Sequence, residues 1–124
     1  MITFEQLEAW REAKNLTVEV YHLGKVKPLA TDFSLRYQIQ RAAVSVMSNI
    51  AEGYERLHVP EKRQFYNVAR ASCGEVRSLL HLLRDLEFIS AEHFESLTEK
   101  SNRVGRLTSG LLRSLENREK HKFT

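Results

Sequence analysis

The sequence has few of the residues that cross-link a chain or interrupt helices. It contains one cysteine, Cys73, and two prolines, Pro28 and Pro60, in 124 residues. A single thiol excludes an internal disulfide framework and fits a reducing compartment. No run approaches the ~20 consecutive apolar residues that span a bilayer. The N-terminal MITFEQLEAW has neither the basic start nor the apolar core of a signal peptide. We therefore expect a cytoplasmic protein without a membrane partner.

The composition is that of an ordinary globular chain. Hydrophobic residues make up 42% and charged residues 28%, which argues against a disordered tail and a fibrous repeat. A chain of this length normally forms one core, so we expect a single domain over residues 1–124. The formal net charge of +3 favours polyanionic partners only mildly. The placement of the charges therefore matters more than their total.

Apolar residues recur at three- and four-residue steps in four segments, which short connections separate. The expected helices span residues 4–24, 33–56, 60–88 and 91–118, and the last is expected to fray into a basic tail. Thr31 or Asp32 and Ser90 are suitable N-caps, and Pro60 suits the start of the third helix. Helices with short connections pack as antiparallel neighbours. The sequence therefore predicts an all-α, up-down-up-down four-helix bundle.

Two chemically different stripes share the second expected helix, in the segment QIQRAAVSVMSNIAEGYER over residues 38–56 and the turn before it. At about 100° per residue, one stripe is apolar and suits a core: Leu35, Ile39, Ala42, Ala43, Val46 and Ile50. The other is polar and too varied for simple solvation: Gln38, Arg41, Ser45, Ser48, Asn49, Glu52 and Arg56. A helix with two specified faces usually makes two kinds of contact, so the polar stripe is the first candidate for a working surface.

The same segment resembles the pattern QxxRAAxSxxxNIAEGxxR of the four-helix bundle proteins encoded in 23S rRNA intervening sequences. The start of the chain is similar to the family's F-x-x-L-x-x-W-x-x-A, and the third helix to its A-x-x-S-x-x-E. The residues that carry these two matches are Phe4, Leu7, Trp10 and Ala13, and Ala69, Ser72 and Glu75. The chain departs from the family at Met47, near which many relatives have Pro, and at Ala71, where many have Gly.

The resemblance covers essentially the whole chain. It implies a small cytoplasmic bundle that assembles as a ring-like homopentamer and binds nucleic acid. It also implies similarity to the accessory proteins of diversity-generating retroelements, so a protein encoded by the same element is an expected partner.

Antiparallel packing predicts which residues of the second and third helices lie level. If their turn is centred near residue 58, Arg41 is level with Glu75 and Asn49 with Asn67. Helical angles put Ser72 and Glu75 on the apolar side, where an unpartnered carboxylate is costly. We therefore predict a structural polar network, and a ligand site is the alternative. The network comprises Arg41, Asn49, Glu52, Ser72 and Glu75.

Two heptad-spaced basic rows are the candidate nucleic-acid-binding surface. The third helix carries Arg63, Arg70, Arg77 and Arg84, and the fourth carries Arg106, Arg113 and Lys120. Each seven-residue step drifts by only ~20°, so a row stays on one face. Tyr66 and His81 are interleaved with the first row, where arginine suits phosphate and a ring can stack on a base. The alternative is a solvated face whose arginines pair with acids such as Glu61 and Glu87.

The apolar run of the third helix, Leu79, Leu80, Leu82, Leu83 and Leu86, is wider than one core face requires. Its width indicates either a subunit interface or a broad inner face that two other helices cover, and the family resemblance favours assembly. Gly74 and Gly105 are level if the following turn lies near residue 90. They either permit close backbone approach or are tolerated at a cost of ~1 kcal/mol each.

Catalytic and metal chemistry find no support in the sequence. The two Glu-x-x-His pairs, which end in His22 and His58, lie ~30 Å apart along the bundle. Cys73 has no His or Asp partner one helical turn away, and there is no glycine-rich phosphate loop. We therefore expect no enzyme, metal or cofactor.

The main functional hypothesis is a non-enzymatic oligomer that binds structured RNA or DNA through the arginine rows. The alternative is a structural or protein-binding assembly module with no direct nucleic-acid contact, in which the arginines serve solubility.

Overall fold

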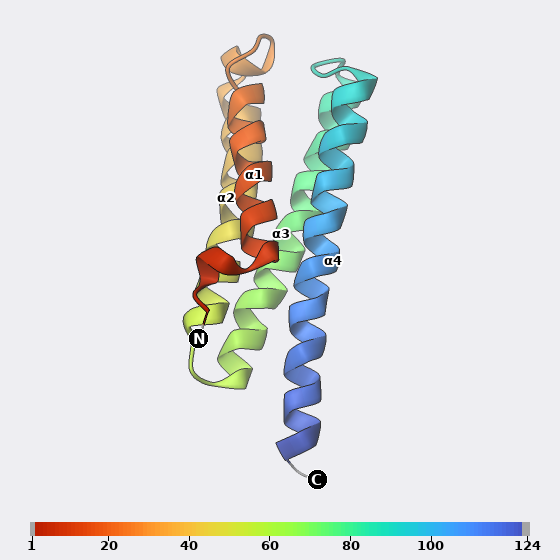
Figure 1. Cartoon of the computed structure of the whole chain (residues 1–124). Helices are drawn as coiled ribbons and strands as arrows, with labels where there is room; N and C mark the ends of the chain where they lie inside the picture. The colour runs from red at the N-terminus through yellow and green to blue at the C-terminus, as the bar shows by residue number, and fades with distance from the viewer. Residues whose placement is uncertain (1, 123–124) are drawn as a thin grey trace.

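The computed structural model describes residues 2–122, over which four long helices and two short 3-10 turns account for the secondary structure. The helices are α1 (Glu8–Leu23), α2 (Phe33–Glu55), α3 (Val59–Asp85) and α4 (Ala91–Lys122), and the turns are η1 (Phe4–Gln6) and η2 (Leu29–Thr31). Figure 1 shows successive helices running in opposite directions with short connections. The predicted all-α, up-down-up-down bundle is therefore confirmed. Within residues 2–122, no helix is long and apolar enough to cross a membrane.

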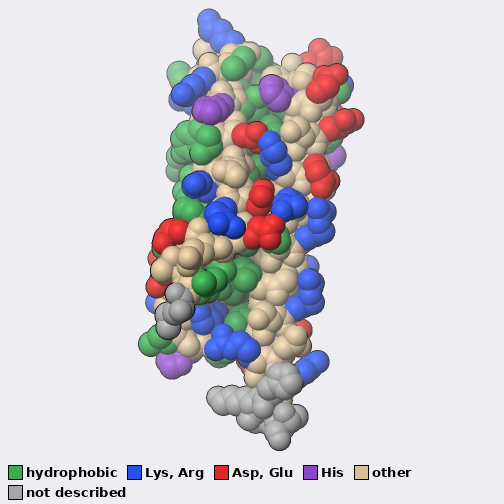
Figure 2. Space-filling model, in the orientation of Figure 1, with side chains coloured by type: hydrophobic (Ala, Val, Ile, Leu, Met, Phe, Trp, Pro, Cys, Tyr) green, Lys and Arg blue, Asp and Glu red, His purple; other side chains and the backbone are tan. Residues whose placement is uncertain are grey.

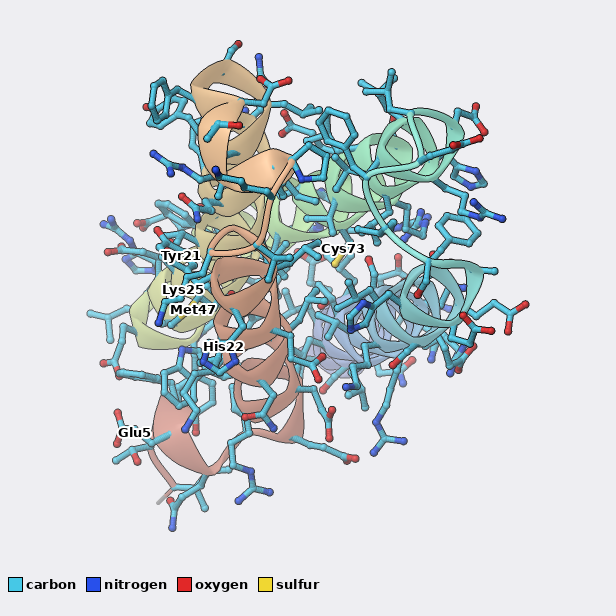
Figure 3. All side chains as sticks on the ribbon, turned by 90° about the horizontal axis from the view of Figure 1, so that it is seen from above. Glu5, Tyr21, His22, Lys25, Met47 and Cys73 are labelled. Atoms are coloured by element: carbon cyan, nitrogen blue, oxygen red, sulfur yellow. The ribbon has the colours of Figure 1, made fainter. Side chains whose placement is uncertain are left out.

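The helices enclose one continuous apolar core. Each helix packs on the next in sequence, and α4 closes the bundle against α1. Fully buried large side chains come from all four helices and from η2: Leu16, Val20, Leu29, Ile39, Val46, Ile50, Val76, Leu80, Leu83 and Val104. The apolar stripe predicted for α2 lies in this core from Ile39 to Ile50. Viewed along the bundle, Cys73 also lies between the helices, whereas Glu5 lies at the periphery (Figure 3).

Polar side chains cap two of the helices at the expected positions. The Asp32 carboxylate accepts a hydrogen bond from the backbone N–H of Leu35 at 3.1 Å, at the start of α2. At the start of α4, the Ser90 hydroxyl accepts one from the backbone N–H of His93, also at 3.1 Å. These caps satisfy N–H groups that have no partner within the first turn of a helix.

A lysine from α3 covers the end of α2. The Lys62 ammonium donates to the carbonyl oxygens of Gly53 (3.3 Å) and Tyr54 (2.7 Å), which the helix leaves without an N–H partner. Burial, and secondarily the nearby Arg118 guanidinium, lower the pKa of Lys62. Gly53 itself stays helical, so it does not adopt the left-handed conformation that ends many helices.

Two helix boundaries near the chain ends differ from the expected ones. The chain starts with the separate turn η1 and not with α1, since the Gln6 side chain accepts a hydrogen bond from the Thr3 backbone N–H at 2.8 Å. The last helix continues to Lys122 and does not fray after residue 118. The final two residues of the expected tail lie outside the described residues.

The third helix ends at Asp85, three residues before the expected boundary. Glu87 has φ of 61°, in the left-handed region, and it reverses the chain. This lets the backbone N–H of Phe88 donate to the carbonyl oxygen of Leu83 at 2.8 Å. The connection to α4 is therefore short, and it fixes how α3 and α4 align.

Candidate functional site

A groove of about 780 Å³ runs between α3 and α4 on the outside of the bundle. Arginines dominate its lining, together with two asparagines and small residues. The lining residues are Asn67, Arg70, Ala71, Arg77, Asn102, Gly105, Arg106, Ser109 and Arg113. A smaller hollow of about 290 Å³ continues it and adds Arg63, Leu112 and Glu116. The two heptad-spaced rows predicted from the sequence thus meet along one groove.

The antiparallel register explains this convergence. The connection between α3 and α4 is centred near residue 88, so Arg70 lies level with Arg106, and Arg63 with Arg113. Seven residues advance a helix by about 10.5 Å, so successive arginine pairs are about that far apart along the groove. Both members of each pair line the same hollow. The groove therefore has arginines on both walls at matching heights.

Acidic and basic residues alternate in blocks along α4. The first third of the helix carries Glu92, Glu95 and Glu99, the middle carries Lys100, Arg103, Arg106 and Arg113, and Glu116 and Glu119 follow. Figure 2 shows acidic side chains gathered on α4 near the α3/α4 turn and basic ones farther along toward the C terminus. Positive charge is therefore concentrated along the part of α4 that borders the groove.

Two of the groove arginines already have carboxylate partners. Arg63 pairs with Glu119 at 2.5 Å, and Arg106 pairs with Glu99 at 3.1 Å. These partners are not Glu61 and Glu87, the acids named from the sequence. A carboxylate oxygen of Glu61 lies instead 3.8 Å from the Arg56 guanidinium.

Three groove arginines are not neutralised in this way. Arg70, Arg77 and Arg113 have no carboxylate oxygen within 4.0 Å among the residues that the structure describes. The unneutralised charge is thus spread along the groove, from Arg77 through Arg70 to Arg113.

Two glycines lie next to an arginine side chain at the groove. A Cβ atom built on Gly105 would meet Arg77 Nη1 at 3.8 Å, and one built on Gly74 would meet Arg77 Nη2 at the same distance. No other atom of the described residues lies within 4 Å of either position, apart from each glycine's chain neighbours and its own helix backbone. Close approach of the two backbones, one of the two explanations predicted for this pair, is therefore wrong. The glycines instead border the Arg77 guanidinium at the wall of the groove.

The outer members of the predicted rows, Arg84 and Lys120, do not line the groove. Arg84 lies in the last turn of α3, beyond Arg77, and Lys120 lies beyond Arg113 on an exposed turn of α4. His81 is exposed, and its ring packs edge-on against Phe94 with centroids 4.9 Å apart.

Tyr66 is not available to stack on a base, so its predicted role is wrong. Its side chain is 3% exposed and packs against Gly53 of α2, where the missing side chain leaves space for the ring. Burial raises the pKa of the Tyr66 phenol to about 12. The arginines of the row are exposed or half-buried, whereas Tyr66, four positions before Arg70, faces α2.

The predicted contact between Arg41 and Glu75 is present across α2 and α3. The guanidinium lies 2.7 Å from the carboxylate, and the two side chains are 47% and 36% exposed. The expectation of a buried carboxylate was wrong, because Glu75 lies at the edge of the seam between the helices. An exposed pair of this kind stabilises by roughly 0.2–1 kcal/mol.

The neutral part of the network lies next to this pair. The hydroxyls of Ser45 and Ser72 share a hydrogen bond of 2.8 Å, and the Asn49 amide donates to the backbone carbonyl oxygen of Ser45 at 2.8 Å. The hydrogen bonds of the Asn49 side chain thus go to Ser45 on its own helix, and Asn67, predicted to lie level with it, lines the groove. Glu52 is not part of the network, because it pairs with Arg56 on its own helix at 3.1 Å.

The groove contains polar residues that the sequence interpretation missed. Asn67, Asn102 and Ser109 lie three or four positions from a groove arginine, which is one helical turn. That spacing is the signal that could have identified them once the arginine rows had been recognised.

Metal ligands do not cluster anywhere in the described part of the chain, where no three His, Cys, Asp or Glu side chains are close enough to hold an ion. Cys73 is buried in the core, and burial raises the pKa of its thiol to about 11.

The fold and the groove together place the chain in a class of proteins, the antiparallel four-helix bundles, with two basic rows along one groove. Residues 5–110 match the family described as 23S rRNA-intervening sequence protein. Because this match spans most of the sequence, the chain belongs to that family. The family description names no catalytic activity.

A solved structure has the same fold. It is the crystal structure of a protein of unknown function from the S23 ribosomal protein family of Bacteroides thetaiotaomicron, with a TM-score of 0.79. The two sequences are 21% identical, and the alignment covers 85% of this chain and 95% of the other. At this identity the likeness shows the fold alone. No match was found among curated proteins.

Proposed function

We propose that the chain is a non-enzymatic, oligomeric bundle that binds structured nucleic acid, RNA or DNA, through the α3/α4 groove. The observation that supports this most directly is the convergence of Arg70, Arg77 and Arg113 on one groove without carboxylate partners among the described residues. Neighbouring guanidiniums repel one another, and an anion with regularly repeated charges relieves that repulsion. A phosphodiester backbone is such an anion, and arginine binds its phosphates through two parallel N–H groups.

The uncharged lining fits the same partner. Asn67, Asn102 and Ser109 supply amide and hydroxyl groups beside the arginines. Side chains of these types make many of the contacts between proteins and the phosphates and sugars of nucleic acids. Such contacts position the partner but carry no base sequence, so we expect binding to depend on shape and charge.

The chemistry of the groove supports binding and not catalysis. Among the described side chains, its lining has no histidine, cysteine or lysine, and no hydrogen bond joins its hydroxyl, Ser109, to its carboxylate, Glu116. The Cys73 thiol is buried in the core and has a raised pKa, so it stays protonated near neutral pH.

Copies of the chain provide a further proposed partner. The face of α2 and α3 that carries the Arg41–Glu75 pair also exposes six large apolar side chains: Phe33, Tyr37, Val44, Val68, Leu82 and Leu86. Phe33 is 68% exposed and Leu82 is 44% exposed, which is unusual for a row along one face. We propose that a second copy covers this apolar face, in a ring for which the family resemblance suggests five subunits.

A ring also needs a second, different contact surface on each copy. Val18 and Tyr21 expose apolar surface on α1, away from α3 (Figure 3 labels Tyr21). The apolar face and the groove lie on different sides of α3, about 120° apart at 100° per residue. Assembly through α2 and α3 would therefore leave the groove open, and a ring would present several grooves to one polyanion.

Nucleic-acid binding is tested by fluorescence anisotropy with a labelled hairpin and a labelled duplex, over a series from ~50 to ~200 mM salt. We expect affinity to fall linearly on a log–log plot. We expect the double variant Arg70→Glu, Arg77→Glu to bind at least ~10-fold more weakly. The matched control, Arg11→Glu with Lys25→Glu, makes the same change in charge at exposed positions outside the groove. Absence of binding at ~50 mM salt, or an unaffected Arg70/Arg77 variant, contradicts the proposal.

Assembly is tested by measuring the mass in solution by light scattering. Leu82→Glu places a charge on the apolar face without entering the core, so it should lower the mass to that of a monomer. Leu57→Glu is the control, since Leu57 is 85% exposed and lies in the turn between α2 and α3. A wild-type chain that is monomeric at micromolar concentration contradicts the proposed ring.

The alternative function is a protein-binding assembly module that makes no contact with nucleic acid. The exposed apolar face favours it, because such a face can also receive another polypeptide, including one encoded by the same element. Under this alternative the wild-type chain would show no nucleic-acid binding, and Leu82→Glu would release the protein partner while Arg70→Glu would retain it.

A further inference from the structure

We infer that the groove recognises the paired phosphate rows of a double helix and not the bases of a single strand. This inference rests on the proposed function and narrows its partner class. It is carried by two observations, the arrangement of the arginines on both walls and the lack of an accessible ring among the residues that line the groove.

The arginines form two facing rows. Arg63 and Arg70 on one wall lie level with Arg113 and Arg106 on the other, and each row repeats after about 10.5 Å. In each level pair one arginine has no carboxylate partner among the described residues (Arg113, Arg70), and the other is in an ion pair (Arg63 with Glu119, Arg106 with Glu99). Packed helices are about 8–10 Å apart, and the side chains on outer faces diverge from there. Two phosphate rows at a fixed spacing are what a duplex presents across each groove, which is about 12 Å wide for the major groove of B-form DNA. A single strand has one row and satisfies only one wall at a time.

The described lining offers no aromatic ring on which an unpaired base can stack. Among the side chains that the structure describes, no Phe, Tyr, Trp or His lines either hollow between α3 and α4. Tyr66, which lies within the arginine row in the sequence, is buried against Gly53. Proteins that hold single strands rely on stacking with aromatic side chains. Without it, a flexible strand must be ordered by phosphate contacts and by weaker stacking on arginine planes, whereas a duplex is ordered in advance.

The centre of the groove is lined by small and uncharged residues. Ala71, Gly105 and Ser109 leave space at the middle of the groove, between the two arginine walls. A rigid phosphate ridge can approach there while the amides of Asn67 and Asn102 contact phosphate or sugar oxygens. This arrangement suits recognition by shape, which is how double-stranded RNA is commonly bound.

The test compares a labelled duplex of about 16 base pairs with its two component strands, chosen so that neither folds on itself. Anisotropy is measured at one salt concentration of ~50 mM with the full-length chain, using RNA and DNA versions. We expect the duplex to bind at least ~10-fold more tightly than either strand, and the preference to be lost with Arg70→Glu. Equal or tighter binding of a single strand overturns the inference and leaves the proposed function standing. Absence of binding to every probe refutes both.

A gain-of-function variant tests the same idea from the other side. Ser109→Trp places a ring at the centre of the groove, so single strands should gain about tenfold in affinity relative to the duplex. Ser114→Trp is the matched control, because Ser114 is exposed on α4 and does not line the groove. A single-strand affinity that Ser109→Trp leaves unchanged, with the duplex still bound, overturns the role assigned to the missing ring.

Discussion

Replacement of Gly53 by alanine tests how tightly α2 and α3 pack beside the groove. The new Cβ would lie 2.6 Å from Cε1 and 2.7 Å from Cδ1 of Tyr66, and 3.3 Å from the carbonyl oxygen of Lys62. The ring is 3% exposed and the carbonyl belongs to the backbone of α3, so neither can move without shifting the helix. Overpacking of a core costs typically about 1–3 kcal/mol, and contacts this short favour the upper half of that range.

The helix propensity of alanine offsets part of this cost. Gly53 has ordinary helical geometry, so alanine should recover about 1 kcal/mol there. The net expectation for Gly53→Ala is a loss of about 1–2 kcal/mol in the free energy of unfolding. Gly74→Ala is the matched control, because its Cβ meets only Arg77 Nη2 at 3.8 Å. That variant should gain about 0.5–1 kcal/mol.

The assay is urea unfolding followed by circular dichroism. All variants are compared at one protein concentration, because assembly would couple stability to concentration. The opposite signs expected for Gly53→Ala and Gly74→Ala separate packing from helix propensity. A Gly53→Ala variant as stable as the wild type would refute the tight contact with Tyr66, and with it the reason given for the burial of that ring.

Three further predictions address single contacts. Glu87→Gly should stabilise the fold by about 1 kcal/mol, because Glu87 has φ of 61° and glycine adopts that conformation without strain. Thermal unfolding measures this gain, and the control variant Glu87→Ala should be as stable as the wild type. Burial raises the pKa of Tyr66 to about 12, so the contribution of its neutral phenol to stability is complete below pH 10, the ordinary tyrosine value, and is lost as the pH rises toward 12. Urea unfolding over this pH range should show the loss in the wild type and not in Tyr66→Phe. A double-mutant cycle with Arg41→Ala and Glu75→Ala should give a coupling of about 0.2–1 kcal/mol, and more than ~2 kcal/mol would contradict the half-exposed geometry.

The helical periodicity predicted the architecture because it reports directly on burial. Four amphipathic segments with short connections leave few ways to pack, and the register followed from the turns alone. That register placed Arg41 level with Glu75, and the two side chains are 2.7 Å apart. The register did not identify the partner of Glu52, because Glu52 pairs with Arg56, four residues away on its own helix.

The groove could be predicted only in part. Heptad spacing identified Arg70, Arg77, Arg106 and Arg113, but periodicity does not report which side of a row faces the neighbouring helix. Tyr66 shows this limit, because its angular position is close to that of the arginines and its burial depends on the absent side chain of Gly53. Ion pairs over seven residues, such as Arg106 with Glu99, depend on side-chain conformations that the sequence does not fix.

The polar stripe of α2, the first candidate for a working surface, is explained by its neighbours. Arg41, Ser45 and Asn49 form contacts at the seam with α3 or within α2, so they hold the two helices in register. The groove lies on another side of α3, and none of these three residues lines it. The seam and the groove thus occupy different sides of α3. Loss of the Arg41–Glu75 pair should therefore weaken folding or assembly, and the salt dependence of the proposed binding at the groove should stay unchanged.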